Sequence, residues 1–98
     1  MTQTPEAKVK RDIKKYLKSL GIFYAEVPGG AYGKKGVSDL IVCYHGHFLA
    51  VEAKAGHGSQ SDWQKLRQHQ IEASGGTYIT VWTLESFKDF LSSLEPIE

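Results

Sequence analysis

The chain has 98 residues, of which 41% are hydrophobic and 23% charged, as is ordinary for a single small globular domain covering residues 1–98. No apolar run approaches the roughly 20 residues that span a bilayer, and the polar start is unlike a signal peptide, so we expect no membrane partner. The single cysteine, Cys43, excludes an intrachain disulfide and a cysteine-based zinc cluster, which fits a cytoplasmic location.

The charges are distributed unevenly along the chain. Residues 1–36 hold eight lysines and arginines against three acids, whereas residues 37–98 hold four basic and eight acidic side chains. A basic front end favours contact with polyanions, although a lysine-rich helix can also be simply solvated.

A first helix is predicted to begin after Thr4, which can cap it, and to end at Gly21. Glu6 falls on the stripe of this helix that faces the core. It is either an acid favoured by the helix dipole or a third carboxylate directed at the core strands, and its position alone leaves both open. The apolar members of the stripe are Val9, Ile13, Tyr16, Leu17 and Leu20.

Residues 22–27 are predicted to form a strand, and residues 28–36 a loop that holds four glycines, two lysines and Tyr32. This loop is either a flexible connector or a basic loop whose backbone approaches a phosphate chain, with Tyr32 stacking on a base or sugar. Its nine residues exceed the usual connector of a small domain, which favours the second interpretation.

Residues 39–44 and 48–54 are predicted to be the two strands of a hairpin. If His45-Gly46 is a two-residue turn, Asp39 lies directly across from Glu52, on the face that also carries Lys54. Two opposed carboxylates destabilise a hairpin unless a cation lies between them, and a divalent metal is the simplest such cation. The opposite face is apolar and consists of Leu40, Val42, Leu49, Val51 and Ala53.

The remaining elements are a helix, a strand and a helix. Ser61 and Gln64 form a capping box at the start of the first of these helices, and residues 77–82 alternate as a strand. The resulting order, α-β-β-β-α-β-α, predicts an α/β fold with a mixed central sheet flanked by helices. One face of the first of these helices is shared by Trp63, Leu66, Gln70 and Ala73. The residues of the last helix expected to face the core are Leu84, Phe87, Phe90, Leu91 and Leu94.

Asp39 followed by Glu52-Ala53-Lys54 resembles the Asp…Glu-x-Lys signature of the PD-(D/E)xK nuclease superfamily. The wider context is similar to the VRR-Nuc family within it, which has stand-alone members in phages and bacteria. The resemblance covers nearly the whole chain and implies a restriction-endonuclease-like nuclease core. The context consists of Gly36-Val-Ser-Asp39 before the hairpin, Gln64-Lys-Leu-Arg after it, and Gly75-Gly76.

The resemblance implies an endonuclease that uses Mg²⁺ or Mn²⁺ to hydrolyse DNA, in a bacterial host cytoplasm if the chain is phage-encoded. Asp39, Glu52 and the backbone carbonyl of Ala53 are implied as metal ligands, and Lys54 as the group beside the scissile phosphate. Glu6 and Gln64 complete the implied catalytic set, although Gln64 can instead serve only in its capping box. Stand-alone family members pair into homodimers resembling Holliday junction resolvases, which implies branched, four-way or flap DNA as the substrate.

A non-catalytic nucleic-acid-binding module with a vestigial metal site is the alternative. A degenerate site would normally have lost one of Asp39, Glu52 and Lys54, so the presence of all three favours the enzyme. RNA in place of DNA also stays open, because phosphate contacts do not distinguish the sugars. The residues expected to bind nucleic acid are Lys8, Lys14, Lys15, Tyr32, Lys34 and Lys35.

Overall fold

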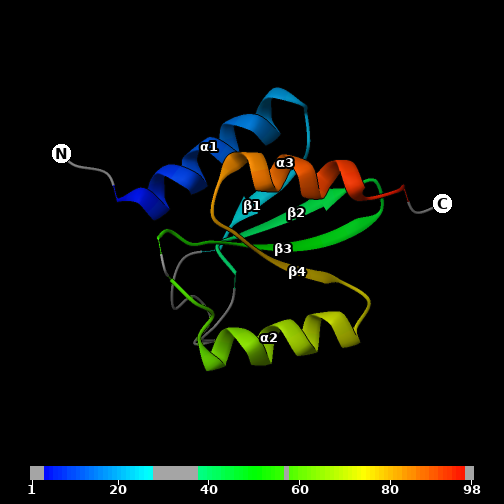
Figure 1. Ribbon diagram of the computed structural model, residues 1–98. Coiled ribbons are helices and arrows are strands. Elements are labelled where there is room, and N and C mark those ends of the chain that lie inside the picture. The colour runs from blue at the N-terminus through cyan, green and yellow to red at the C-terminus, as the bar shows by residue number, and fades with distance from the viewer. Residues whose placement is uncertain (1–3, 28–37, 57, 97–98) are drawn as a thin grey trace.

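The structure, a computed structural model, describes residues 4–27, 38–56 and 58–96. The elements follow the predicted order (Figure 1). They are α1 (Pro5–Ser19), β1 (Tyr24–Glu26), β2 (Leu40–Tyr44), β3 (His47–Ala53), α2 (Asp62–Ala73), β4 (Thr77–Val81) and α3 (Leu84–Ser93). The predicted strand at residues 22–27 is thus shorter than expected, and Asp39 lies just before β2 instead of within it.

The four strands form one mixed sheet in the order β1-β2-β3-β4. β1 and β2 pair antiparallel, as do β2 and β3, whereas β3 and β4 pair parallel. The parallel pairing requires a crossover connection, which contains α2. Helices α1 and α3 cover one face of the sheet and α2 covers the other (Figure 1). This arrangement confirms the predicted α/β fold with a mixed sheet between helices.

The hairpin of β2 and β3 has the predicted register. Tyr44 pairs with His47 across a two-residue turn, in which His45 and Gly46 have φ angles of 46° and 90°. Two successive positive φ angles are typical of the type I′ turn, whose twist matches that of the strands. Leu40 pairs with Val51, so continuing the register by one residue places Asp39 across from Glu52.

The core lies between the sheet and the two helices α1 and α3. The predicted apolar hairpin face is buried there, each side chain at most 1% exposed. The helices contribute Ile13 and Leu17 from α1 and Phe87 and Leu91 from α3. Leu20 is 54% exposed, so its expected place in the core is wrong: it is the C-cap residue, where α1 has already ended.

The face of α2 that Trp63, Leu66, Gln70 and Ala73 share is exposed. Trp63 and Leu66 are 48% and 42% exposed, and Gln70 and Ala73 are exposed as well. The side chain that α2 buries is Gln64. Because α2 has few apolar residues, its periodicity identifies the inner face poorly, and the capping box turns Gln64 toward the sheet.

Among the described helices, none combines the length and apolar character needed to cross a membrane.

Candidate metal centre

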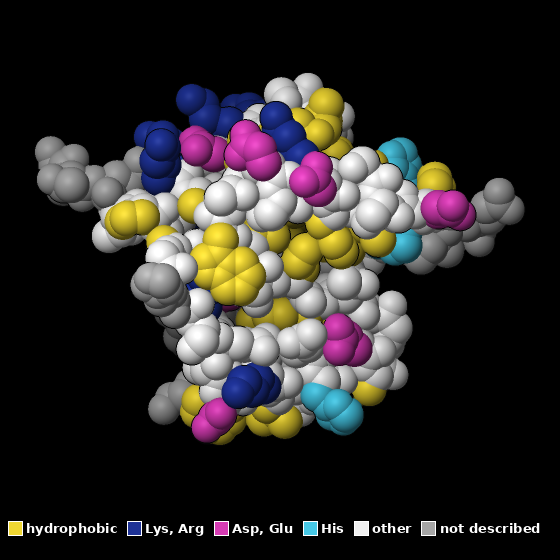
Figure 2. Space-filling model, viewed as in Figure 1, with side chains coloured by type: hydrophobic (Ala, Val, Ile, Leu, Met, Phe, Trp, Pro, Cys, Tyr) yellow, Lys and Arg dark blue, Asp and Glu magenta, His cyan; other side chains and the backbone are white. Residues whose placement is uncertain are grey.

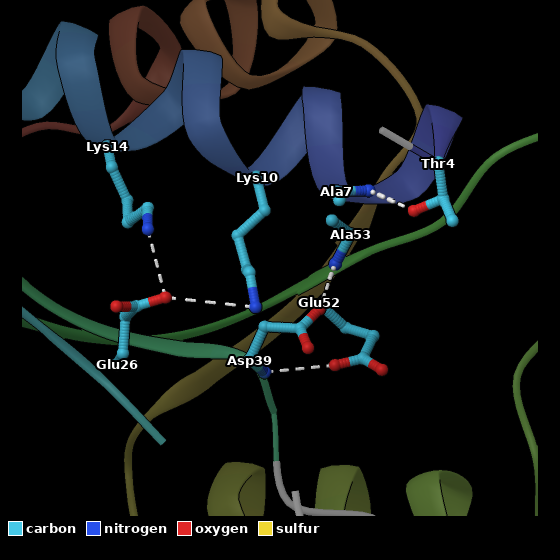
Figure 3. Close-up of polar contacts among 8 residues, drawn as sticks. All are labelled: Thr4, Ala7, Lys10, Lys14, Glu26, Asp39, Glu52 and Ala53. Carbon is cyan, nitrogen blue, oxygen red and sulfur yellow. Dashed lines mark hydrogen bonds and ion pairs between the residues drawn. The ribbon is translucent and has the colours of Figure 1, made fainter. Parts of the chain in front are cut away.

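Asp39 and Glu52 hold each other through backbone amides of the hairpin. The Asp39 N–H donates to Glu52 Oε2 at 3.0 Å, and the Ala53 N–H donates to Asp39 Oδ2 at 2.8 Å (Figure 3). The cross-strand register places each carboxylate beside an amide of the opposite strand, so both side chains are oriented by rigid backbone. The Asp39 carbonyl in turn accepts from the Val27 N–H at 2.8 Å, which fixes it against β1.

Glu6 brings a third carboxylate to this pair. Each of Glu6, Asp39 and Glu52 offers one oxygen, and these three oxygens lie within 4.8 Å of one another. Glu6 is positioned by the first turn of α1, where the Thr4 hydroxyl accepts from the Ala7 N–H at 3.1 Å. The structure therefore supports the interpretation of Glu6 as a carboxylate near the core strands. We call Glu6, Asp39 and Glu52 the carboxylate cluster.

Glu52 is a buried carboxylate beside a second one. Its side chain is 6% exposed and faces Asp39. Burial, and then the charge of Asp39, raise the pKa of Glu52 from 4.5 to about 8, whereas Lys54 lowers it only in part. A divalent cation among the three carboxylates would favour the ionised form of Glu52. An all-oxygen donor set suits the hard cations Mg²⁺ and Mn²⁺.

Gln64 makes the contacts of the capping box and also contacts Glu52. Its side-chain oxygen accepts from the Ser61 N–H at 2.9 Å, and its own N–H donates to Ser61 Oγ at 3.1 Å, which completes the capping box. Its side-chain amide nitrogen meanwhile donates to Glu52 Oε1. The two ends of one amide thus join the start of α2 to the carboxylate cluster.

Lys54 follows β3 directly and adjoins the cluster. Its Nζ lies 4.0 Å from Glu52 Oε1, and its side chain is 16% exposed. Its backbone N–H donates to the Val81 carbonyl at 2.9 Å, so the base of the side chain is fixed by the sheet. At this distance the ammonium group is not committed to a hydrogen bond with Glu52 and can serve another anion.

Tyr78 is a site neighbour that sequence reasoning missed. It is 4% exposed and pairs with Ala50, two residues before Glu52 on β3. Burial and the charges of Glu52 and Asp39 raise the pKa of the Tyr78 hydroxyl, which keeps it neutral. The alternation of β4 places Tyr78 inward, but only the parallel pairing with β3 places it beside the carboxylates.

Lys10 is the second neighbour that sequence reasoning missed. It lies on α1 one turn after Glu6, and its Nζ is 3.7 Å from Glu26 Oε1. Lys14 Nζ reaches the same oxygen at 3.0 Å. Both ion pairs cross from α1 to β1, so they depend on how the helix docks on the sheet, and the spacing along the chain does not reveal them.

The residues predicted to bind nucleic acid are only partly described. Lys8 and Lys15 are exposed on α1, and Lys14 is half-buried in its pair with Glu26. Lysine and arginine side chains gather over α1 in Figure 2. The three predicted loop residues lie outside the described residues; they are Tyr32, Lys34 and Lys35.

Comparisons with known proteins give a structural match. No protein-family model matches the chain. No curated protein matches its sequence. A solved structure titled "VRR_NUC domain" aligns with a TM-score of 0.80 and 19% sequence identity, over 95% of this chain and 100% of that one. This match supports the resemblance to VRR-Nuc at the level of the fold, and the chain therefore has the fold of a VRR_NUC domain.

Proposed function

We propose that the protein is a divalent-metal-dependent nuclease that hydrolyses phosphodiester bonds of DNA. The observation that carries the proposal is the carboxylate cluster itself. Three carboxylates from separate elements converge within 4.8 Å, with Lys54 at one side and Gln64 behind Glu52. The resemblance to VRR-Nuc in sequence signature and fold supports the same activity.

The chain would hold Mg²⁺ or Mn²⁺ by Asp39, Glu52 and Glu6, together with the backbone carbonyl of Ala53. When bound, the ion lowers the pKa of a coordinated water and polarises the phosphate. Lys54 places a positive charge where negative charge develops on the phosphoryl oxygens. Gln64 keeps Glu52 oriented by donating to it, while the capping box prevents the amide from turning away.

A panel of duplex, flap, splayed and four-way DNAs, each with Mg²⁺, Mn²⁺ or EDTA, tests the activity. We expect cleavage in either metal, none in EDTA, and none in the Asp39→Ala and Lys54→Ala variants. The Lys65→Ala variant, on the exposed surface of α2, is the matched control and should keep full activity. Unchanged cleavage in the Asp39→Ala and Lys54→Ala variants would refute the proposal, provided that circular dichroism shows both to be folded.

The finer parts of the proposal concern the substrate and the assembly. We infer branched, four-way or flap DNA as the preferred substrate and a homodimer as the active form, on the grounds of the VRR-Nuc resemblance. Cleavage of plain duplex at an equal rate would exclude the first inference, and matched RNA substrates would show whether the sugar matters. A sedimentation species of 10.9 kDa alone at micromolar concentration would exclude the second. Binding that persists in EDTA without cleavage in any metal would instead indicate a non-catalytic nucleic-acid-binding module.

A further inference from the structure

Lys10 shares an opening to solvent with the carboxylate cluster. Its side chain extends from α1 toward Asp39 and Glu26 (Figure 3) and is 34% exposed. It lines a hollow of about 200 Å³ together with Thr4, Glu6, Ala7 and Asp39. An ammonium group and two of the three clustered carboxylates therefore border the same space. A phosphate that entered this space would meet a cation in addition to the metal.

The ion pair between Lys10 and Glu26 is the weaker of the two that Glu26 makes. Lys14 reaches Glu26 Oε1 at 3.0 Å, within hydrogen-bond range, whereas Lys10 remains at 3.7 Å. The Lys14 hydrogen bond is also the main cause that lowers the pKa of Glu26. An exposed pair with such geometry contributes little stability, so Lys10 can leave Glu26 for another anion at little cost.

The backbone fixes this pair relative to the cluster. Glu26 on β1 pairs with Leu40, and the next residue, Val27, donates its N–H to the Asp39 carbonyl at 2.8 Å. Lys10 is one turn along α1 from Glu6. Lys10 thus stands on the helix that carries Glu6, and Glu26 on a strand whose following residue is hydrogen-bonded to Asp39. An anion held by Lys10 would keep a constant distance from one held at the cluster.

We propose that Lys10 binds the backbone phosphate next to the one that is cleaved, and that Glu26 occupies Lys10 until nucleic acid displaces it. This inference rests on the proposed nuclease function. Lysine is a common phosphate ligand, and phosphate contacts fix the register of a nucleic acid on a protein. Lys54 at the end of β3 and Lys10 on α1 then contact successive phosphates from two different elements.

The first test compares Lys10→Gln with Lys18→Gln. Both remove one positive charge from α1, but Lys18 is exposed in the last turn of the helix, away from the hollow. We expect Lys10→Gln to lower kcat/KM about tenfold or more, as for loss of a charged hydrogen bond, and Lys18→Gln to stay within about twofold. Equal effects of the two variants would overturn the inference.

The second test maps the contact to one phosphate. Single neutral methylphosphonates are placed at successive positions around the bond that the wild-type protein cleaves. At one flanking position the methylphosphonate should lower kcat/KM of the wild-type protein about as much as Lys10→Gln lowers it on normal DNA. The same methylphosphonate should not lower kcat/KM of the Lys10→Gln protein further. Additive losses at every position would overturn the inference, because they would show that Lys10 contacts none of these phosphates.

A third variant, Glu26→Gln, tests the competing carboxylate. Removing its charge frees both Lys10 and Lys14 from Glu26, so we expect DNA affinity in EDTA and low salt to rise about twofold to threefold. The rise should disappear in the Glu26→Gln/Lys10→Gln double variant if Lys10 is the lysine that Glu26 occupies. Affinity that is unchanged or weaker would overturn the part of the inference that concerns Glu26. Fluorescence anisotropy of a labelled DNA measures this directly, with Glu72→Gln, the same loss of one negative charge on the exposed surface of α2, as the control for charge alone.

The cleavage and affinity measurements together separate a failure of this inference from a failure of the proposed function. If the wild-type protein cleaves and Lys10→Gln behaves like Lys18→Gln, the nuclease proposal stands and the role of Lys10 fails. If no metal gives cleavage, the nuclease proposal fails, and the methylphosphonate scan is read from binding affinities. A single position that couples to Lys10 would still support the phosphate contact. If no position couples to Lys10, the inference is overturned.

Discussion

Helices α1 and α2 are attached to the same sheet by opposite means. Helix α1 buries Ile13 and Leu17, both fully inaccessible, so the hydrophobic effect holds it to the core. Among its described residues, α2 buries Gln64, and the contact that Gln64 makes is polar and ends on Glu52. Apolar burial therefore holds α1 to the core, whereas the buried contact of α2 ends on the carboxylate cluster, to which α1 contributes Glu6.

The largest expected effect comes from the α1 side. Leu17→Ala removes a side chain that is 0% exposed and leaves a cavity, so the free energy of unfolding should fall by about 2–5 kcal/mol. Urea denaturation measures this loss. Leu66→Ala on α2 is the matched control, because Leu66 is 42% exposed and its loss should cost less than about 1 kcal/mol. Equal costs would contradict the comparison.

The next effect depends on pH and belongs to the α2 side. The pKa of Glu52 is raised to about 8 in the folded protein from 4.5, so the folded state binds the proton more tightly than the unfolded state. The stabilisation of the folded state by this tighter proton binding is present in full below pH 4.5 and is lost as the pH rises toward 8. The loss is on the order of a few kcal/mol in metal-free protein. Urea midpoints measured in EDTA across this range test it.

Two further measurements sharpen the pH prediction. In Glu52→Gln the decline in stability between pH 4.5 and 8 should largely disappear, because the titrating group is gone. Added Mg²⁺ should stabilise the wild-type protein more at pH 8 than at pH 6, since ligand oxygens must be deprotonated to bind a metal. A stability that rises with pH in metal-free protein would show that the folded state does not retain the proton on Glu52.

The smallest effect separates the two roles of Gln64. Gln64→Ala loses the side-chain acceptor for the Ser61 N–H, which is half of the capping box, and the donor to Glu52, and should cost about 1–2 kcal/mol. Gln64→Glu keeps an oxygen for the Ser61 N–H but sets a like charge beside Glu52, so it should reduce cleavage at least as strongly while α2 stays capped. Gln70→Glu, exposed on the same helix, adds the same charge as a control and should keep full activity.

The sequence predicted the hairpin well because its determinants are local. A two-residue turn at His45-Gly46 and strict alternation leave one register, and that register places Asp39 across from Glu52. The capping residues Thr4 and Ser61 located the starts of α1 and α2 for the same reason. Each of these signals lies within a few residues of the feature that it specifies.

The features that the sequence did not reveal depend on contacts between distant elements. Lys10 and Tyr78 reach the carboxylate cluster only through the docking of α1 and the parallel pairing of β4 with β3. The inner face of α2 was not identified from the sequence: Trp63 and Leu66 share an exposed face, whereas Gln64 is buried and donates to Glu52. Hydrophobic periodicity alone therefore does not identify the face that α2 turns to the sheet.

The reciprocal amide contacts of Asp39 and Glu52 also bear on how the protein folds. The two residues are separated by 13 positions and joined by a tight turn, so the loop-closure entropy for bringing them together is small. Glu6 arrives only when α1 docks on the sheet, a contact between segments far apart in the chain. Two carboxylates of the site are therefore brought together when the hairpin forms, and the third joins them only when α1 packs on the sheet.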